Sequence, residues 1–374
     1  MLKKLLILVV LLGIAYALSP AFIQKGLYHN FSNVTDYQIF ENATVKHGKA
    51  EPWLKSAEYN QRTPDSKLLD TIKDNQTIAF LVIQNDSIQY ENYWAGYGEK
   101  SLSGSFSMAK SVISMLMGIA IEEGKVKSID DYVSNYIPEL KREGTDTIKI
   151  KDLLTMSAGF KWTESYWNLF GKTADIYYGD RVRQVVGSLK ADYAPGQKYY
   201  YSSAETQLIA WVIENAYGRS IPDLFSEKIW SKIGAENDAL WSLDKKDGVA
   251  KAFCCLNSNA RDFARLGKLV LQNGMWDSVQ IVPSSYIKEA TTADSWLMDE
   301  NGNPVDFYGY QFWIINYKGM KIPYFRGVQG QMIYVIPDKN AVVVRLGEYV
   351  SQDKVNHHSV DTYTYLDAAF EVLK

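Results

Sequence analysis

The tetrapeptide Ser107-Met108-Ala109-Lys110 combines two residue types whose spacing could support nucleophilic catalysis. It opens an apolar segment, 108–121, which predicts a helix that ends before Gly124. Residues three positions apart lie on one face of a helix, so the serine hydroxyl and the lysine amine can meet. Burial lowers the pKa of a lysine, and the neutral amine can then take the serine proton. The pattern predicts Ser107 as a nucleophile and Lys110 as its base.

The same S-x-x-K spacing occurs three more times, starting at Ser242, Ser285 and Ser351. Those three serines stand in polar stretches that no apolar helix follows. The spacing alone is therefore a weak signal, and Ser107 stands out because of the helix behind it.

A second candidate segment, 195–203, runs through three consecutive tyrosines and two serines into a predicted helix. A tyrosine held beside a lysine can pass a proton to a leaving group, as a phenolate or through a hydrogen bond. Tyr201 is the candidate for this role. The alternative is a turn whose serine caps the following helix.

A third segment, Gly327-Val328-Gln329-Gly330-Gln331, lies between two predicted strands. Closely spaced glycines on a strand let a substrate approach the backbone. A backbone N–H in this segment and that of Ser107 could together form an oxyanion hole. The alternative is a β-bulge or a tight turn.

Composition narrows the remaining chemistry. The chain has 374 residues with 43 acidic and 40 basic side chains, and 47% of its residues are hydrophobic. These values indicate a folded globular protein and exclude a disordered chain, a disulfide scaffold and a basic nucleic-acid-binding surface. There are only 4 His and 2 Cys, without metal-binding spacing, so no metal or cofactor is expected. Cys254 and Cys255 are adjacent, and we expect two buried thiols in a helical segment rather than a disulfide.

The N-terminus resembles an export signal. Lys3 and Lys4 precede an apolar run, 5–18, that contains an A-x-A site at 15–17. If the run is counted to residue 23, it approaches the roughly 20 residues that span a bilayer. Cleavage and retention as an anchor both remain open, with a slight preference for the anchor. Either outcome places the rest of the chain on the periplasmic or extracellular side. Retention would hold it at the inner membrane by residues 5–23.

The remaining pattern predicts strands at both ends of the chain and helices between them. A hairpin is expected at 77–94, helices at 208–216, 260–272 and 361–373, and strands at 310–316, 321–325, 332–336 and 341–346. This order predicts one antiparallel sheet, completed by the two ends, with a large helical insertion. An aromatic stretch, 160–178, is expected to line an apolar pocket, to act as a lid, or simply to pack as a loop.

The three segments, in this order and spacing, resemble the serine β-lactamase-like and penicillin-binding-protein-like hydrolases. The resemblance runs from about Thr77 to Lys374 and includes segments 130–140, 150–159 and 260–267. It is strongest to the 6-aminohexanoate-dimer hydrolases and related esterases, through 201–204 and Gly330-Gln331. The resemblance implies an α/β (α+β) fold of the β-lactamase/transpeptidase type, in which helices flank an antiparallel sheet. An inserted all-helical subdomain would complete the catalytic cleft.

The resemblance also implies roles for individual residues. Ser107 would form the acyl-enzyme, Lys110 and Tyr201 would move its proton, and the backbone of Val328 would complete the oxyanion hole with that of Ser107. The implied substrate-binding residues are Tyr166, Ser203, Gly327 and Gln329.

The third segment departs from the family pattern. Phe325-Arg326-Gly327 replaces the usual Lys or His, Thr or Ser, and Gly, and Gln329 replaces a His. The cation that binds a substrate carboxylate is therefore missing from its usual place, with Arg326 as a candidate substitute. This departure favours ester or amide substrates over β-lactams.

Together these observations predict a signal or anchor at 1–23, an N-terminal extension at 24–73 and a hydrolase domain at 74–374, with a helical subdomain at about 107–290. The predicted function is serine hydrolysis of a small ester, amide or peptide without a cofactor, nucleic acid or identifiable protein partner. Membrane association through the N-terminus is expected. The alternative is a penicillin-binding-type sensor that recognises D-peptides with slow or no turnover.

Overall fold

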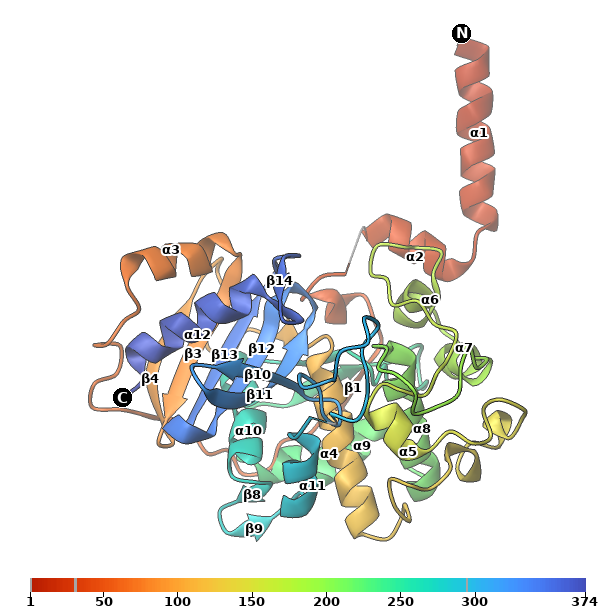
Figure 1. Ribbon diagram of the computed structural model, residues 1–374. Helices are drawn as coiled ribbons and strands as arrows, with labels where there is room; N and C mark the ends of the chain where they lie inside the picture. Colours follow the sequence, from red (N-terminus) through yellow and green to blue (C-terminus); the bar gives the residue numbers. More distant parts are fainter. Residues whose placement is uncertain (1, 30–31, 294) are drawn as a thin grey trace.

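A hairpin near the N-terminus and four strands near the C-terminus form one central sheet (Figure 1). The computed structural model describes residues 2–29, 32–293 and 295–374. Within them the strand order is β10 (Trp313–Tyr317), β11 (Met320–Gly327), β12 (Gln331–Ile336), β13 (Ala341–Gly347), β3 (Thr77–Gln84), β4 (Ser87–Tyr93) and β2 (Leu54–Lys55). All neighbours are antiparallel except β2 and β4. The predicted sheet, closed by the two ends of the chain, is confirmed.

The β3–β4 hairpin forms because its turn residues suit a two-residue connection. Asn85 and Asp86 both adopt positive φ values, 50° and 59°, as a type I′ turn requires. Every residue of β3 is buried, since the strand lies inside the sheet and helices cover both faces. Phe80 and Val82 pack into one apolar cluster, and Leu81 and Ile83 pack into the other.

Helices cover both faces of this sheet. On one face, α12 (Val360–Val372) packs beside α3 (Ser66–Asp74). On the other, α10 (Ala260–Leu271) crosses β13 and β12. Gly267 permits this close approach, because a Cβ atom there would lie 2.5 Å from Val342. The predicted helices at 260–272 and 361–373 are confirmed.

The inserted part of the chain is built around α4 (Met108–Glu122), which is buried over almost its whole length. Its neighbours are α8 (Ser203–Tyr217), α9 (Ile221–Lys228) and α11 (Ser284–Ala290). Other helices of this part are α5 (Ile150–Leu154), α6 (Lys172–Tyr178) and α7 (Val182–Gly187). The helices predicted after Ser107 and at 208–216 are confirmed.

Short strands accompany these helices. A second sheet has the order β1 (Asn42–Val45), β6 (Ala239–Ser242), β7 (Leu256–Ser258) and β5 (Ser103–Gly104). Two small hairpins, β8–β9 (Met275–Trp276, Val279–Gln280) and β14–β15 (Lys354–Val355, His358–Ser359), lie outside both sheets. The stretch 160–178 is irregular until α6 begins, so its last third is a helix rather than a loop.

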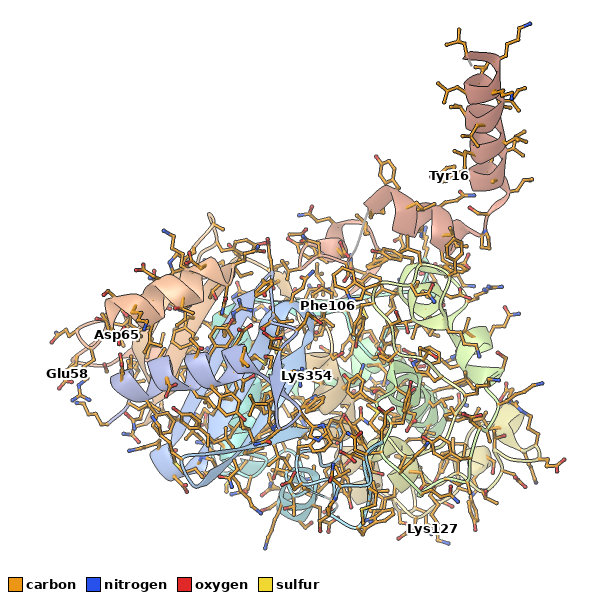
Figure 2. The ribbon with its side chains drawn as sticks, turned by 45° about the horizontal axis from the view of Figure 1, so that its top comes forward. Tyr16, Glu58, Asp65, Phe106, Lys127 and Lys354 are labelled. Atoms are coloured by element: carbon orange, nitrogen blue, oxygen red, sulfur yellow. A yellow bond between two sulfur atoms is a disulfide. The ribbon has the colours of Figure 1, made fainter. Side chains whose placement is uncertain are left out.

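The N-terminal helix stands away from the rest of the molecule (Figures 1 and 2). α1 (Leu2–Leu18) is apolar and has no buried residue, whereas α2 (Ala21–His29) packs Phe22 and Ile23 against Ala174 and Tyr178 of α6. No single helix in the described ranges is long and apolar enough to cross a bilayer. α1 and α2 meet that test only as a pair, bent by 119° at the break between them.

The two cysteines correct one prediction. Cys254 and Cys255 lie in an irregular segment before β7, not in a helix, and they form a disulfide with each other. Their Cα atoms are 3.7 Å apart, below the range of disulfides between separate segments. The bridge closes because Cys255 adopts a left-handed backbone conformation with φ 73°, which a helical segment would not allow.

Candidate active site

Ser107 and Lys110 lie side by side at the start of α4. Ser107 immediately precedes the first helical residue, and both side chains are buried, with exposed fractions of 8% and 1%. Burial lowers the pKa of Lys110 to about 7, although the negative charge of Glu164 acts in the opposite direction. A large share of the Lys110 side chains is therefore uncharged at neutral pH, which a general base requires.

Two oxygen atoms accept hydrogen bonds from the Lys110 amine. Its Nζ donates to the backbone oxygen of Phe253 at 2.8 Å and to Oγ of Ser203 at 3.0 Å. A neutral amine has two N–H donors and one lone pair. If both donors are committed in this way, the lone pair remains for the hydroxyl of Ser107.

Glu164 fixes the direction of the bond between Lys110 and Ser203. Its Oε1 accepts from Ser203 Oγ at 2.7 Å, so the single hydroxyl proton of Ser203 is committed to the carboxylate. Ser203 Oγ can then only accept from Lys110. Oε2 of Glu164 accepts from the backbone N–H of Ser203 at 2.8 Å and from Nε1 of Trp162 at 2.7 Å, and these bonds hold the carboxylate in place.

Tyr201 completes the cluster. Its hydroxyl is hydrogen-bonded to Ser107, and the ring lies 5.4 Å from the Lys110 Nζ. Burial, together with the charge of Glu164, raises the pKa of Tyr201 well above its usual value, and the bond to Ser107 offsets this only in part. Tyr201 is therefore a neutral phenol at physiological pH, which favours the hydrogen-bond relay over the phenolate.

The end of β11 lies directly against the segment that precedes Ser107. A Cβ atom on Gly327 would lie 2.3 Å from the backbone oxygen of Ser105, so only glycine fits at this approach. The approach brings Val328, the next residue, to the mouth of the site, where it lines the same two hollows as Ser107. The pairing of Val328 and Ser107 as oxyanion donors remains a prediction that agrees with this placement.

Two hollows of different character meet at Ser107. The first is mainly apolar and is lined by Phe106, Leu169, Ala174, Tyr177, Tyr178, Phe253 and Cys254 among others. The second is a more polar cleft lined by Glu164, Trp167, Trp313, Arg326, Gln352 and Lys354 among others. Tyr166 lines both hollows, and its exposed fraction is 41% although its hydroxyl is directed to Glu164.

The predicted substrate-binding residues take different positions. Gly327 lines the polar cleft, and Ser203 is buried at the edge of the apolar hollow, where it contacts Lys110. Gln329 is not among the lining residues of either hollow, and its Nε2 donates to the backbone oxygen of Ser32 at 2.6 Å. Arg326 lies 4.4 Å from the ring of Trp313 in the cleft.

Sequence reasoning missed three contributors to this site, namely Glu164, Phe253 and Cys254. Glu164 stands between aromatic residues in an irregular loop, and Phe253 acts through its backbone oxygen, so neither carries a local motif. Within the described ranges, no group of three His, Cys, Asp or Glu side chains could hold a metal ion.

Comparison with known proteins agrees with this geometry. The sequence model of the β-lactamase family matches residues 66–366. The chain is 25% identical over 336 residues to the 6-aminohexanoate-dimer hydrolase of Paenarthrobacter ureafaciens, covering 86% of this chain and 84% of that protein. The chain therefore belongs to the β-lactamase family, and it is a serine hydrolase of that family.

Solved structures show the same fold. A Bacillus anthracis protein provisionally assigned as a 6-aminohexanoate-dimer hydrolase superposes with a TM-score of 0.80 at 24% identity, covering 91% of this chain and 93% of that one. A family VIII carboxylesterase superposes with a TM-score of 0.61 at 16% identity, covering 89% and 100%. The predicted β-lactamase/transpeptidase fold is confirmed.

Proposed function

We propose that the protein hydrolyses small esters or amides through an acyl-enzyme on Ser107. The hydroxyl proton of Ser107 passes to the neutral amine of Lys110 while Oγ attacks the carbonyl carbon. The carbonyl electron pair moves to the oxygen, which is held by the backbone N–H groups of Ser107 and Val328. The leaving group departs with the proton, delivered from Lys110 through Tyr201, and water then cleaves the acyl-enzyme.

The hydrogen-bond directions around Lys110 carry this proposal. Phe253 and Ser203 accept the two N–H groups of the neutral amine, and Glu164 prevents Ser203 from donating in return. The arrangement leaves a lone pair for Ser107 and thereby prepares Lys110 as a base before a substrate binds.

The two hollows suggest the substrate class. A leaving group must depart into solvent, so we assign it to the polar cleft, where Arg326 and Lys354 would suit a leaving group that carries a carboxylate. The acyl part of the substrate then occupies the apolar hollow. A linear aliphatic amide or ester fits this division better than a bulky bicyclic substrate.

Labelling with a fluorophosphonate probe tests the nucleophile. We expect the wild type to gain one probe adduct on Ser107 and to release p-nitrophenol from short p-nitrophenyl esters. Ser107→Ala should lose both activities, because the variant lacks the attacking oxygen. The hydroxyl of Ser203 also contacts Lys110, but its proton is committed to Glu164. Ser285→Ala is the matched control, since Ser285 has the same S-x-x-K spacing on the exposed side of α11.

Two outcomes would contradict the proposal. Equal labelling of wild type and Ser107→Ala would exclude Ser107 as the nucleophile. Labelling at Ser107 without release of p-nitrophenol beyond one equivalent would instead indicate the sensor that recognises D-peptides.

We also propose that the chain is exported and held at a membrane through α1, with the hydrolase domain on the outer side. α1 is the exposed part of the predicted anchor 5–23, whereas Phe22 and Ile23 pack against α6. The fully exposed apolar α1 and the disulfide support this proposal, because disulfides persist mainly in oxidising compartments. In cells that express the full chain, we expect the protein in a carbonate-resistant membrane fraction with its N-terminus intact. A soluble form that begins after Ala17 would exclude the anchor, and a cytosolic form would exclude export.

A further inference from the structure

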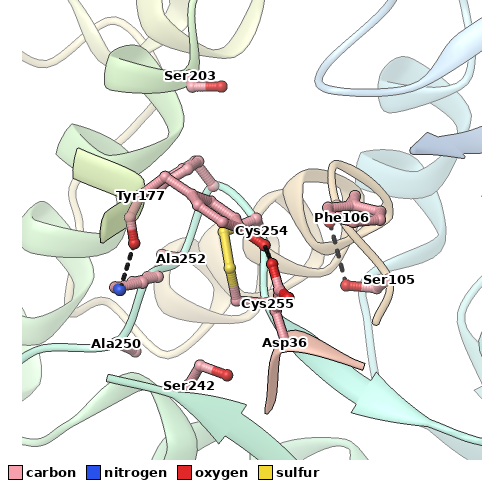
Figure 3. Close-up of a disulfide and its surroundings, with 12 residues drawn as sticks. Asp36, Ser105, Phe106, Tyr177, Ser203, Ser242, Ala250, Ala252, Cys254 and Cys255 are labelled. Atoms are coloured by element: carbon pink, nitrogen blue, oxygen red, sulfur yellow. Dashed lines mark hydrogen bonds between the residues drawn. A yellow bond between two sulfur atoms is a disulfide. The ribbon is translucent and has the colours of Figure 1, made fainter. Parts of the chain in front are cut away.

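The disulfide between Cys254 and Cys255 lies within the substrate-binding part of the molecule. Cys254 lines the apolar hollow together with Ser107, Phe106 and Tyr177. Figure 3 shows the bridge between Tyr177 on one side and Phe106 on the other. Both cysteines are almost fully buried, so the bridge is an inner wall of the hollow and not a surface staple.

The segment that carries the bridge also carries the acceptor for the catalytic base. Phe253 directly precedes Cys254, and its backbone oxygen accepts from Lys110 Nζ at 2.8 Å. On the other side, the backbone oxygen of Cys255 accepts from the backbone N–H of Ser242 and from Nδ2 of Asn257, both at 2.9 Å. The bridged pair thus connects the small sheet to the oxygen that orients Lys110 on one side of Phe253. On the other side, the backbone N–H of Lys251 donates to the backbone oxygen of Ser242 at 2.9 Å.

The disulfide closes a small ring through the peptide bond between Cys254 and Cys255, and this ring restricts the backbone conformations of the segment. Cys255 has φ 73°, a left-handed conformation that residues with a side chain adopt uncommonly. Such a conformation persists only where surrounding constraints hold it, and here the covalent bridge across the neighbouring peptide supplies one. Without the bridge, we expect the segment to sample other conformations and the Phe253 oxygen to leave Lys110 for part of the time.

We propose that the Cys254–Cys255 disulfide is a positioning and specificity-determining element of the active site, which holds the Phe253 carbonyl on Lys110 and forms the wall against which the acyl chain packs. This inference rests on the proposed hydrolase function. Sulfur atoms are polarizable and contact hydrocarbon favourably, so the bridge suits an apolar acyl chain.

Reduction by dithiothreitol removes the element selectively. A thiolate of the reagent attacks one sulfur atom, the other leaves as a thiolate, and the second thiol of the reagent then releases the mixed disulfide. The protein gains two electrons and two protons as two thiols, and the reagent is oxidised to its cyclic disulfide. The thiols are counted by alkylation in denaturant and mass spectrometry.

The experiment compares the full chain in detergent in oxidised and reduced form, with p-nitrophenyl acetate and p-nitrophenyl octanoate. We expect reduction to lower kcat about tenfold for both esters, and to raise KM for the octanoate more than for the acetate. We also expect the midpoint of the pH–kcat profile to rise above 7, because water that enters the loosened site favours the charged form of Lys110. Reoxidation should restore all three values.

The double variant with Cys254→Ser and Cys255→Ser serves as the matched control. It should resemble the reduced wild type and should not respond to dithiothreitol. The proposal is overturned if the fully reduced protein keeps its kcat, its pH midpoint and its preference between the two esters, or if the protein contains two free thiols before reduction. Fluorophosphonate labelling of the oxidised protein distinguishes a failure of this proposal from a failure of the proposed hydrolase function. A lack of labelling at Ser107 refutes the hydrolase function itself.

Discussion

Lys110→Met is expected to lower the rate of Ser107 acylation by about three orders of magnitude, the range that a general base contributes. Methionine fills a similar volume and keeps the site apolar, so the loss reports the missing lone pair rather than a cavity. The rate of fluorophosphonate labelling measures acylation directly. A variant that is labelled as fast as the wild type would refute the assignment of Lys110.

The same assignment fixes the direction of the pH dependence. Below pH 7 the amine of Lys110 is protonated and has no lone pair, whereas above pH 7 it is neutral, because burial lowers its pKa to about 7. Acylation should therefore rise with pH through a midpoint near 7.

A second buried lysine provides the control for this profile. Burial also lowers the pKa of Lys251 to about 7, but its amine donates to the backbone oxygen of Tyr177 and not to the catalytic cluster. Lys251→Met should keep the midpoint of the labelling profile near 7. A midpoint that disappears in this variant would assign the titration to Lys251 instead.

Glu164→Gln is expected to lower kcat about a hundredfold while KM changes little. The glutamine amide donates where the carboxylate oxygen accepted, so the hydroxyl of Ser203 no longer has to give its proton to residue 164. Ser203 can then donate to the lone pair of Lys110 and occupy it. The measurement is steady-state hydrolysis of p-nitrophenyl acetate at a pH well above 7.

Glu122→Gln makes the same chemical change on the exposed end of α4 and should leave kcat unchanged. A rise in KM with unchanged kcat in Glu164→Gln would show that Glu164 contacts substrate instead of directing a proton. Equal constants in Glu164→Gln and wild type would remove it from the mechanism.

Local spacing in the sequence predicted only part of the candidate catalytic cluster. Ser107 and Lys110 share one helix turn, so the S-x-x-K spacing already places them together. Tyr201 required the resemblance to known hydrolases, since other Tyr-x-Ser or Tyr-x-Asn triplets begin at Tyr132, Tyr166 and Tyr349. Glu164 meets Ser203 across 39 positions and Phe253 meets Lys110 across 143, and only the folded chain brings these atoms together.

The fold, like the site, was predicted only in part from the sequence. The strands at 77–93 and 320–347 are long enough for their hydrophobic pattern and turn residues to predict them. The strands of the second sheet have two to four residues, too few for a periodicity to appear, and they were not predicted. The prediction of two free thiols at Cys254 and Cys255 was wrong. It relied on the usual spacing of bridged Cα atoms, which does not apply to neighbours that close a ring through their own peptide.

The packing of α2 has a practical consequence for recombinant versions of this protein. A Cβ atom at Gly26 would lie 2.9 Å from Leu169, which lines the apolar hollow, and Ser32 lines the same hollow. A shortened protein that begins at Ser19 keeps this cover, whereas one that begins at Asn33 loses it. A protein shortened to Asn33 to improve its solubility would expose Ala174 and Tyr178 to solvent. Because both residues line the apolar hollow, the substrate selectivity measured on that shortened protein would differ from that of the full chain.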